Sequence, residues 1–293
     1  MYQWAILASL ESVRTMTDVL CIIAHPDDET RLCGGIIAHL TEQGIKIQLL
    51  CLTRGEGGEL GEPPLVNRAG LGRMREDELR CAATKLGIDA VTFMDYVDPP
   101  VSADNTTSAP RHKPDELTEQ IAEQIRLHSP TTVLTHGSNG EYGHPAHLLL
   151  HHLTRRAIET IVSNPPPLYS FAATFQGHGY PRLTNQDDPA HMIVNVKSVL
   201  GKVVEAAHCH RTQHALFVRR QTKRTNRQVT VSEIVRCAPF EGVHRHMPTV
   251  DGKPKNHFAR WMKKCPHYRA TLEMPLPTLH QITKWDYNWR VRC

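Results

Sequence analysis

The chain has 293 residues, of which 40% are hydrophobic, and this is enough to bury the core of one large α/β domain or two smaller ones. No apolar run approaches the length of a membrane helix, and the N-terminus lacks the basic start and cleavage signature of a secretory peptide, so we expect a globular, cytoplasmic protein. The eight cysteines form no C-x-x-C pair, which predicts reduced core residues and neither a disulfide framework nor a zinc knuckle.

Strands and helices are expected to alternate along the chain after an N-terminal extension, residues 1–17, in which Met16 offers an alternative start. Apolar runs and helical periods predict, in chain order, a strand 18–24, a helix 33–43, a strand 45–52, a helix 68–86, a strand 90–94, a helix 114–128, a strand 131–135, a helix 146–161, a strand 168–175, an apolar segment 191–196 and a helix 197–210. This order favours a Rossmann-like, doubly wound and mostly parallel sheet with helices on both faces. Ligands of such folds bind at the carboxyl ends of the strands.

The composition changes near residue 218, where the chain becomes basic and is punctuated by tryptophans such as Trp285 and Trp289. We therefore expect a main domain over residues 18–217 and a basic C-terminal extension, 218–293, packed on the same domain. The net charge of +4 is modest and no nucleic-acid-binding module is recognised. The extension is thus predicted to form an oligomer contact or a lid, with no nucleic acid and no membrane as partner.

The stretch AHPDDE, residues 24–29, follows the first predicted strand. His25 and Asp28 have a spacing that lets an imidazole and a carboxylate reach one Zn²⁺, with Asp27 facing whatever the metal binds. Helix capping would explain any one of these acidic residues. Three adjacent carboxylates repel one another, however, unless a cation or a proton relieves them. The stretch therefore predicts a metal site at the end of the first strand.

A second strand-end loop, residues 139–147 with the sequence NGEYGHPAH, holds a tyrosine and two histidines at the start of a helix. Catalytic metal sites combine three protein ligands with an open position, and one of His144 and His147 would complete such a set with the first loop. A rival pair is His147 and His151, which lie four residues apart on one helix face. No glutamate stands between them as in the thermolysin-type motif.

Together these motifs resemble the PIG-L/LmbE family of zinc-dependent N-deacetylases, which act on N-acetylglucosamine-type amino sugars and include enzymes of mycothiol and bacillithiol biosynthesis. The resemblance covers about residues 18 to 214. It rests on AHPDDE at 24–29, Gly34-Gly35, a Thr-Arg-Gly-Glu turn at 53–56, the helix motif 73–79 that leads to Leu86-Gly87, YGHPAH at 142–147 and HRTQ at 210–213.

The resemblance implies a role for each matching residue. The implied metal ligands are His25, Asp28 and His147. Asp27 is implied as the general base, and His144 as the group that stabilises the oxyanion or protonates the leaving amine. Tyr142 matches a tyrosine that helps to polarise the amide carbonyl. The implied cofactor is Zn²⁺, with Fe²⁺ as an alternative for the same ligands, and the implied partners are a small amino-sugar substrate and further copies of the chain in a homo-oligomer.

One position departs from the family pattern. Many relatives have an aspartate between the two histidines, where this chain has Ala146, and the change bears on the pKa of His144 and hence on the rate. A catalytically weak, sugar-binding member and a thiol-conjugate amidase are therefore the alternatives to an N-deacetylase.

Substrate contacts are expected from side chains near the strand ends. The expected residues are Arg73, Glu29, Asp98 and His210. Arg75 is a further arginine on the helix that carries Arg73, and either could bind sugar hydroxyls or instead lie on a solvated helix face.

Overall fold

The computed structural model describes residues 17–102, 104, 106–161, 163–249, 255–265 and 268–270. The expected N-terminal extension up to Met16, together with Trp285 and Trp289, lies outside these residues. None of the described helices combines the length and apolar content needed to cross a membrane.

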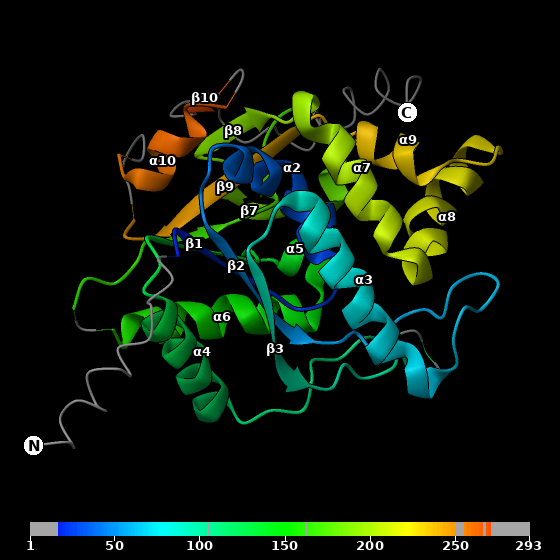
Figure 1. The fold of residues 1–293 in the computed structure, drawn as a ribbon, viewed down its shortest axis with the longest axis horizontal. Coiled ribbons are helices and arrows are strands. Elements are labelled where there is room, and N and C mark those ends of the chain that lie inside the picture. Colours follow the sequence, from blue (N-terminus) through cyan, green and yellow to red (C-terminus); the bar gives the residue numbers. More distant parts are fainter. Residues whose placement is uncertain are drawn as a thin grey trace, which may run out of the picture.

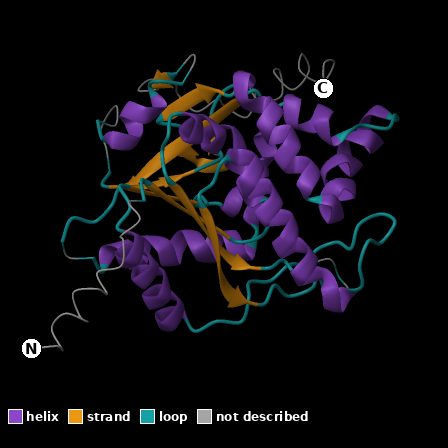
Figure 2. Ribbon diagram, in the orientation of Figure 1, coloured by secondary structure: helices purple, strands orange, loops and turns teal. Residues whose placement is uncertain are grey.

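A mixed sheet forms the centre of the described chain (Figure 1, Figure 2). Its strands are β1 (Val19–Ile23), β2 (Ile47–Thr53), β3 (Ala90–Tyr96), β4 (Thr132–Thr135), β5 (Leu168–Ser170), β8 (Met192–Asn195), β9 (Phe240–Met247) and β10 (Arg269–Ala270). They lie in the order β10-β8-β9-β5-β4-β1-β2-β3. The pairs from β3 to β5 are parallel, and the pairs that involve β8, β9 and β10 are antiparallel. The predicted α/β class with a mostly parallel, doubly wound sheet is confirmed.

Helices cover both faces of the sheet because both faces are apolar. One face packs against α2 (Asp28–Glu42), α3 (Leu71–Leu86) and α7 (Leu200–Cys209), and the other against α4 (Pro114–His128) and α6 (Pro145–Glu159) (Figure 1). Alternate residues of β1 enter the two cores: Val19 and Ile23 join the first, whereas Leu20 and Ile22 join the second. Burial on both faces is typical of parallel strands and explains why the sequence reads there as a continuous apolar run.

The helix after β1 begins five residues earlier than expected, at Asp28 and not at residue 33. Asp28 and Glu29 stand in its first turn, where carboxylates complement the helix dipole. At Cys33 the backbone leaves the helical region, and the second part of α2 starts afresh. Glu241 of β9 accepts hydrogen bonds there from the backbone N–H groups of Gly35 and Ile36, at 2.9 and 2.8 Å. Burial raises the pKa of Glu241 to about 7.

Other expected elements are divided in the structure. The strand expected at 168–175 is β5 plus β6 (Ala173–Thr174), which pairs with β7 (Asn185–Pro189) in a small separate sheet. The helices expected at 68–86 and 197–210 each start with a 3₁₀ turn, η1 (Arg68–Gly70) and η3 (Lys197–Val199). The remaining helical elements are α5 (Gly140–Gly143), η2 (Pro181–Leu183), η4 (Arg211–Gln213), α8 (His214–Thr225), α9 (Val231–Arg236) and α10 (His257–Met262).

The described part of the C-terminal extension contributes to the central sheet. The expected boundary between residues 217 and 218 falls inside α8, and β9 lies between β5 and β8. The sequence hides this strand because Phe240–Met247 mixes apolar residues with charged and histidine side chains and lacks a clear alternation.

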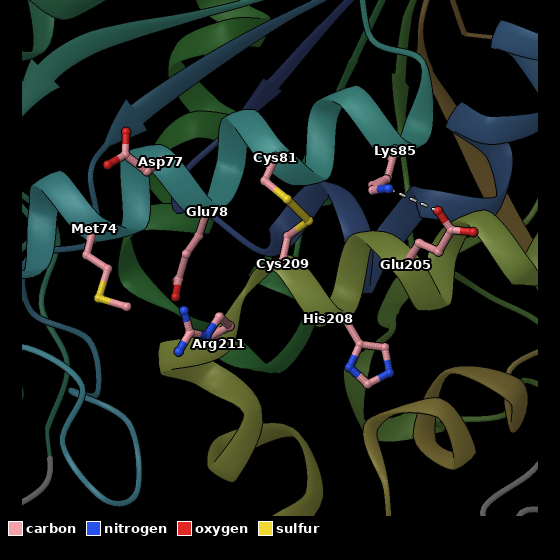
Figure 3. A pocket seen from close by; sticks show the side chains of 9 residues that line it. All are labelled: Met74, Asp77, Glu78, Cys81, Lys85, Glu205, His208, Cys209 and Arg211. Carbon is pink, nitrogen blue, oxygen red and sulfur yellow. Dashed lines mark ion pairs between the residues drawn. A yellow bond between two sulfur atoms is a disulfide. The ribbon is translucent and has the colours of Figure 1, made fainter.

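The expectation that every cysteine is reduced is wrong. Cys81 of α3 and Cys209 of α7 form a disulfide that joins the two helices, beside an ion pair of 3.3 Å between Lys85 and Glu205 (Figure 3). The two cysteines are 128 residues apart, and only the packing of α3 against α7 brings their Cα atoms to 5.8 Å. No sequence spacing could reveal this pair. The described cysteines that stay free and buried are Cys21, Cys33, Cys51 and Cys265.

We predict that Cys81→Ser lowers the free energy of unfolding by about 2–4 kcal/mol, because a cross-link over a long loop restricts the unfolded chain. Denaturant unfolding with and without a thiol reductant measures the change. The reductant should lower the stability of the wild type to that of the variant and leave the variant unchanged. A wild type that is insensitive to the reductant would contradict the prediction.

Candidate metal centre and active site

The candidate site lies where the strand order reverses, at the carboxyl ends of β1 and β4. Crossovers leave these two neighbouring strands toward opposite faces, and this opens a crevice in which open α/β sheets bind ligands. The loop after β1 supplies His25, Asp27 and Asp28. The segment after β4 supplies His136 and, in the first turn of α6, His147. The fold thus unites the two loops that the sequence analysis singled out.

Three residues bring potential ligand atoms close together between these loops: one nitrogen each from His25 and His147, and the two carboxylate oxygens of Asp28. His25 Nδ1 lies 3.3 Å from His147 Nε2, and Asp28 Oδ1 lies 3.4 Å from the same Nε2. Asp28 Oδ2 lies 3.5 Å from His25 Nδ1. Ligands held tetrahedrally at about 2.0–2.1 Å from Zn²⁺ are about 3.4 Å apart. The spacing therefore fits three corners of a tetrahedral metal site and leaves the fourth corner for water or substrate.

Carboxylates orient the outer nitrogen of each histidine. His147 Nδ1 donates to Glu141 Oε2 at 2.6 Å, and His25 Nε2, buried without a hydrogen bond among the described residues, lies 3.4 Å from Asp98 Oδ1. Histidines that bind metals almost always direct the second ring nitrogen at such a group, which fixes the tautomer. Burial alone would lower the pKa of His147, but Asp28 and Glu141 outweigh it and raise this pKa to about 10. Without a cation, the site holds a proton there.

His136 forms, with Asp28 and His147, a further group that could hold a metal ion, but both of its ring nitrogens are engaged in hydrogen bonds. Its ring stacks on that of His147 with centroids 3.9 Å apart. Its Nε2 accepts a hydrogen bond from the backbone N–H of Ala24 at 3.0 Å, and its Nδ1 donates to Glu141 Oε2 at 2.9 Å. Both ring nitrogens are therefore used, and His136 supports the site by holding Glu141 and the end of β1.

Glu141 is the residue of this site that the sequence analysis missed. It has a positive φ of 59°, a conformation that costs energy for a residue with a side chain. Its carboxylate also accepts hydrogen bonds from the Gly137 backbone and from Asn185 Nδ2, both at 3.1 Å. Burial opposes the charge of Glu141, yet His136 and His147 hold its pKa well below the usual range. No sequence motif marks it, because its partners come from β7 and from both sides of α5.

Asp27 directly precedes Asp28 in the chain and lies in a strained turn. Its φ of 111° is in the left-handed region, and the backbone N–H of Asp27 is held by Glu29 Oε2 at 3.0 Å. Arg75 Nη2 lies 3.6 Å from Asp27 Oδ2. Burial raises the pKa of Asp27 to about 6, and the opposite charge of Arg75 limits the rise. The side chain is thus a carboxylate near neutral pH and a proton acceptor of useful strength.

Arg75, not Arg73, is the arginine of the site. Arg73 lies on the solvent face of α3, with 85% of its side chain exposed, and pairs with Asp77. Arg75 is buried and donates from Nη1 to the Gly55 carbonyl at 2.9 Å and from Nη2 to the Pro26 carbonyl. A Cβ on Gly55 would meet Arg75 at 2.2 Å, so glycine is required there. The substrate contact expected for Arg73 is therefore not supported by its position.

Glu29 and His210 form a buried pair beside the loop that follows β1. Glu29 Oε1 and His210 Nε2 are 2.7 Å apart, and both side chains are fully buried. The pair can position the backbone of Asp27, but it offers no surface to a substrate, unlike the contact expected from the sequence. Asp98 is also buried and lies 3.4 Å from His25 Nε2, while its backbone N–H donates to Glu56 Oε2 at 3.0 Å.

His144 and Tyr142 flank the opening of the site. The His144 ring lies 4.7 Å from the rings of both His25 and His147, and its Nδ1 is buried without a hydrogen bond among the described residues. Tyr142 is 57% exposed, with its ring 5.7 Å from that of His144. Burial and the neighbouring histidines lower the pKa of His144 to about 3 in the absence of a metal. Within the described part of the chain, neither side chain is hydrogen-bonded to a carboxylate.

The rival pair of His147 and His151 is not assembled. His151 Nδ1 lies 3.0 Å from the carbonyl of His136, and its ring packs 4.6 Å from that of His246. It therefore faces away from the donors of the first loop. Ala146, the departure from the family pattern, is fully buried in the apolar core beneath α6.

Comparison with known proteins gives related sequences. Residues 20–158 match the family model described as PIG-L, GlcNAc-PI de-N-acetylase. The chain is 30% identical over 201 residues to a probable N-acetyl-alpha-D-glucosaminyl L-malate deacetylase 2 of Bacillus anthracis, covering 68% of this chain and 83% of that protein. It is 35% identical over 152 residues to the 1D-myo-inositol 2-acetamido-2-deoxy-alpha-D-glucopyranoside deacetylase of Thermobifida fusca, covering 47% of this chain and about half, 53%, of that relative.

Solved structures share the fold. The N,N'-diacetylchitobiose deacetylase of Pyrococcus horikoshii aligns with a TM-score of 0.54 and 18% identity, covering 84% of this chain and 93% of that one. GalB, a 4-carboxy-2-hydroxymuconate hydratase of Pseudomonas putida, aligns with a TM-score of 0.53 and 24% identity, covering 82% and 99%. The same fold thus serves a deacetylase and a hydratase, so the reaction must be argued from the site.

We predict that Glu141→Gln weakens Zn²⁺ binding by about 10–100-fold, because the carboxylate that orients His147 and balances its charge is lost. Competition with a chromophoric chelator measures the dissociation constant. Glu159→Gln, which changes an exposed glutamate at the end of α6, the helix that carries His147, is the matched control and should bind as the wild type does. Equal affinity of the two variants would show that Glu141 has no part in holding the metal.

Proposed function

Because the chain belongs to the PIG-L family of de-N-acetylases, hydrolases of N-acetyl amide bonds that depend on a metal, we propose that it removes the acetyl group from a small molecule containing N-acetylglucosamine. The observation that carries the proposal is the cluster of donor atoms from His25, Asp28 and His147, with contacts of 3.3–3.5 Å, next in the chain to Asp27, whose carboxylate pairs with Arg75. Such a cluster, with one open corner, is the kind of site that hydrolytic metalloenzymes use.

The proposed cofactor is Zn²⁺, held by His25 Nδ1, Asp28 and His147 Nε2. Two imidazoles and a carboxylate suit Zn²⁺, and Fe²⁺ is an alternative for the same donors. The outer nitrogens of both histidines face carboxylates, Asp98 and Glu141, which supports this assignment. When bound, the metal supplies a Lewis acid that polarises the amide carbonyl and activates water.

Asp27 is proposed as the general base that takes the proton of the attacking water. It directly precedes Asp28 in the chain, and its position is fixed by Glu29 through the backbone N–H and by Arg75 at 3.6 Å. A base must lie within hydrogen-bond reach of the proton it removes. The strained turn at Asp27 places the side chain there before substrate arrives.

His144 and Tyr142 are proposed to donate hydrogen bonds to the oxygen that becomes negative as the carbonyl is attacked. Donors aimed at developing charge are a large part of catalysis in acyl transfer. In this chain the residue between His144 and His147 is Ala146, and no described carboxylate is hydrogen-bonded to His144. The hydrogen-bond donor role therefore suits His144 better than that of an acid protonating the amine.

The substrate is proposed to be an N-acetylglucosamine joined to a small polar group. The curated relatives are named for an inositol and a malate conjugate of this sugar, and a related fold acts on diacetylchitobiose. Acetate release from these three compounds by the Zn²⁺-loaded protein tests the proposal, with chelator-treated protein as the control. Acetate from at least one compound, lost on chelation and restored by Zn²⁺, is the expected result.

Two outcomes would replace the proposal. Sugar binding without release of acetate would favour a catalytically weak member of the family. The reason to consider such a member is Ala146, at the position where many relatives have an aspartate. Cleavage of a thiol-conjugate amide in preference to the three sugars would keep the hydrolase and change its substrate.

We predict that Asp27→Asn lowers the rate of acetate release by about 10²–10⁴-fold, the usual contribution of general-base catalysis, and leaves one Zn²⁺ at the site. Metal analysis and an acetate assay on the same preparations measure both. Asp95→Asn is the matched control, since Asp95 also ends a strand with a positive φ but is exposed and pairs with Arg54. A rate within threefold of the wild type would remove Asp27 from the mechanism.

A further inference from the structure

A second group of side chains that could bind a metal lies on the opposite side of His151 from the site described above. Asp188, His244 and His246 each place one donor atom within 4.8 Å of the others. His151 lies between the two groups, because its Nδ1 faces the His136 carbonyl and its ring packs against that of His246. None of the three residues belongs to the site described above.

Strands β7 and β9 supply the three residues of this second group, and the pairing of β9 with β5 sets the position of the two histidines. Asp188 comes from β7, and His244 and His246 come from β9, where the register with β5 shifts by one residue. Ser170 pairs with His244 and Leu168 with Met247, so β9 has one residue more than β5 over this stretch. Such a bulge redirects side chains and is common beside functional sites. Here it leaves the two histidine rings 4.7 Å apart.

The hydrogen bonds of His244 fix the tautomer that a metal needs. Its Nδ1 donates to the Pro189 carbonyl at 2.7 Å, which leaves Nε2 with its lone pair and without a hydrogen bond among the described residues. A backbone carbonyl on the outer nitrogen is the usual partner of a ligating histidine. His191, whose ring is 4.3 Å from that of His244, differs: its Nδ1 accepts from the Arg245 backbone N–H, so its Nε2 carries the proton.

The carboxylate of Asp188 is 2% exposed and is held by Ser138 through its backbone N–H at 2.8 Å and its Oγ at 2.6 Å. His246 Nε2 lies 3.3 Å from Asp188 Oδ2 and 3.0 Å from Ser170 Oγ. Hydrogen bonds account for the burial of Asp188, but they do not account for the Nε2 of His244, which has no hydrogen bond among the described residues and belongs to the same cluster. Two imidazoles and a buried carboxylate are a donor set of transition-metal sites.

We propose that Asp188, His244 and His246 bind a second divalent transition-metal ion, of the Zn²⁺ class, with a fourth position open to water. The ion would link β7 and β9 to the loop that leads to the active site, because Asp188 also holds Ser138. Asn185 of the same strand β7 bonds Glu141. The second ion therefore has a structural role toward the loop that carries Glu141.

Zinc stoichiometry of chelator-treated protein reloaded with Zn²⁺ and passed through a desalting column tests the proposal without reference to activity. We expect two equivalents in the wild type, one in His244→Ala, one in His25→Ala and none in the double variant. His191→Ala is the matched control and should keep two, because the His191 ring is adjacent to that of His244 but its Nδ1 accepts a hydrogen bond, so its Nε2 carries a proton and has no lone pair for a metal. A His244→Ala variant that binds as much Zn²⁺ as the wild type would overturn the site.

A Co²⁺ titration of the wild type, followed by visible absorption, serves if the substitution prevents folding. Two successive binding steps are expected, and a single step at one equivalent would contradict the second site. His246→Gln provides a second variant, in which only the later or the weaker step should disappear. Loss of the step assigned through His25→Ala would instead show that the two groups form one site.

Discussion

Asp27, Asp28 and Glu29 place three adjacent carboxylates after the end of β1, and the repulsion between their charges must be compensated. Several surrounding elements supply this compensation. Asp27 faces Arg75 of α3, Asp28 faces His25 and His147, and Glu29 faces His210 beyond α7. Each carboxylate thus has a partner from a different part of the chain. Like charges at such distances are tolerated only with compensation of this kind. These pairs connect α3, α6 and the residue that follows α7 to the end of the strand.

The parts of the site that the sequence revealed are those set by short spacings. His25, Asp27 and Asp28 stand in one turn, and His144 and His147 in another, so motif and strand order suffice to bring them to one edge of the sheet. Arg75 was within reach of the same reasoning. It lies four residues from both Leu71 and Leu79 on the buried stripe of α3, whereas Arg73 falls on the opposite face.

The parts that the sequence hid depend on contacts between distant segments. Glu141 owes its role to His136, His147 and Asn185, and the disulfide of Cys81 owes its partner to the packing of two helices. Ala146 gains a physical explanation here. It fills the apolar core under α6, where a carboxylate would need a partner, while Glu141 supplies a carboxylate to the neighbouring histidine from the loop.

The position of β9 bears on how the chain could be shortened. The family match ends at residue 158, yet β5 presents its outer edge to β9, and Glu241 of that strand caps the second part of α2. A fragment that stops before residue 240 would leave the β5 edge unpaired, and such edges recruit strands from other molecules and promote aggregation. Insolubility of a trimmed fragment would then report a missing strand, and would say nothing against the fold or the metal centre.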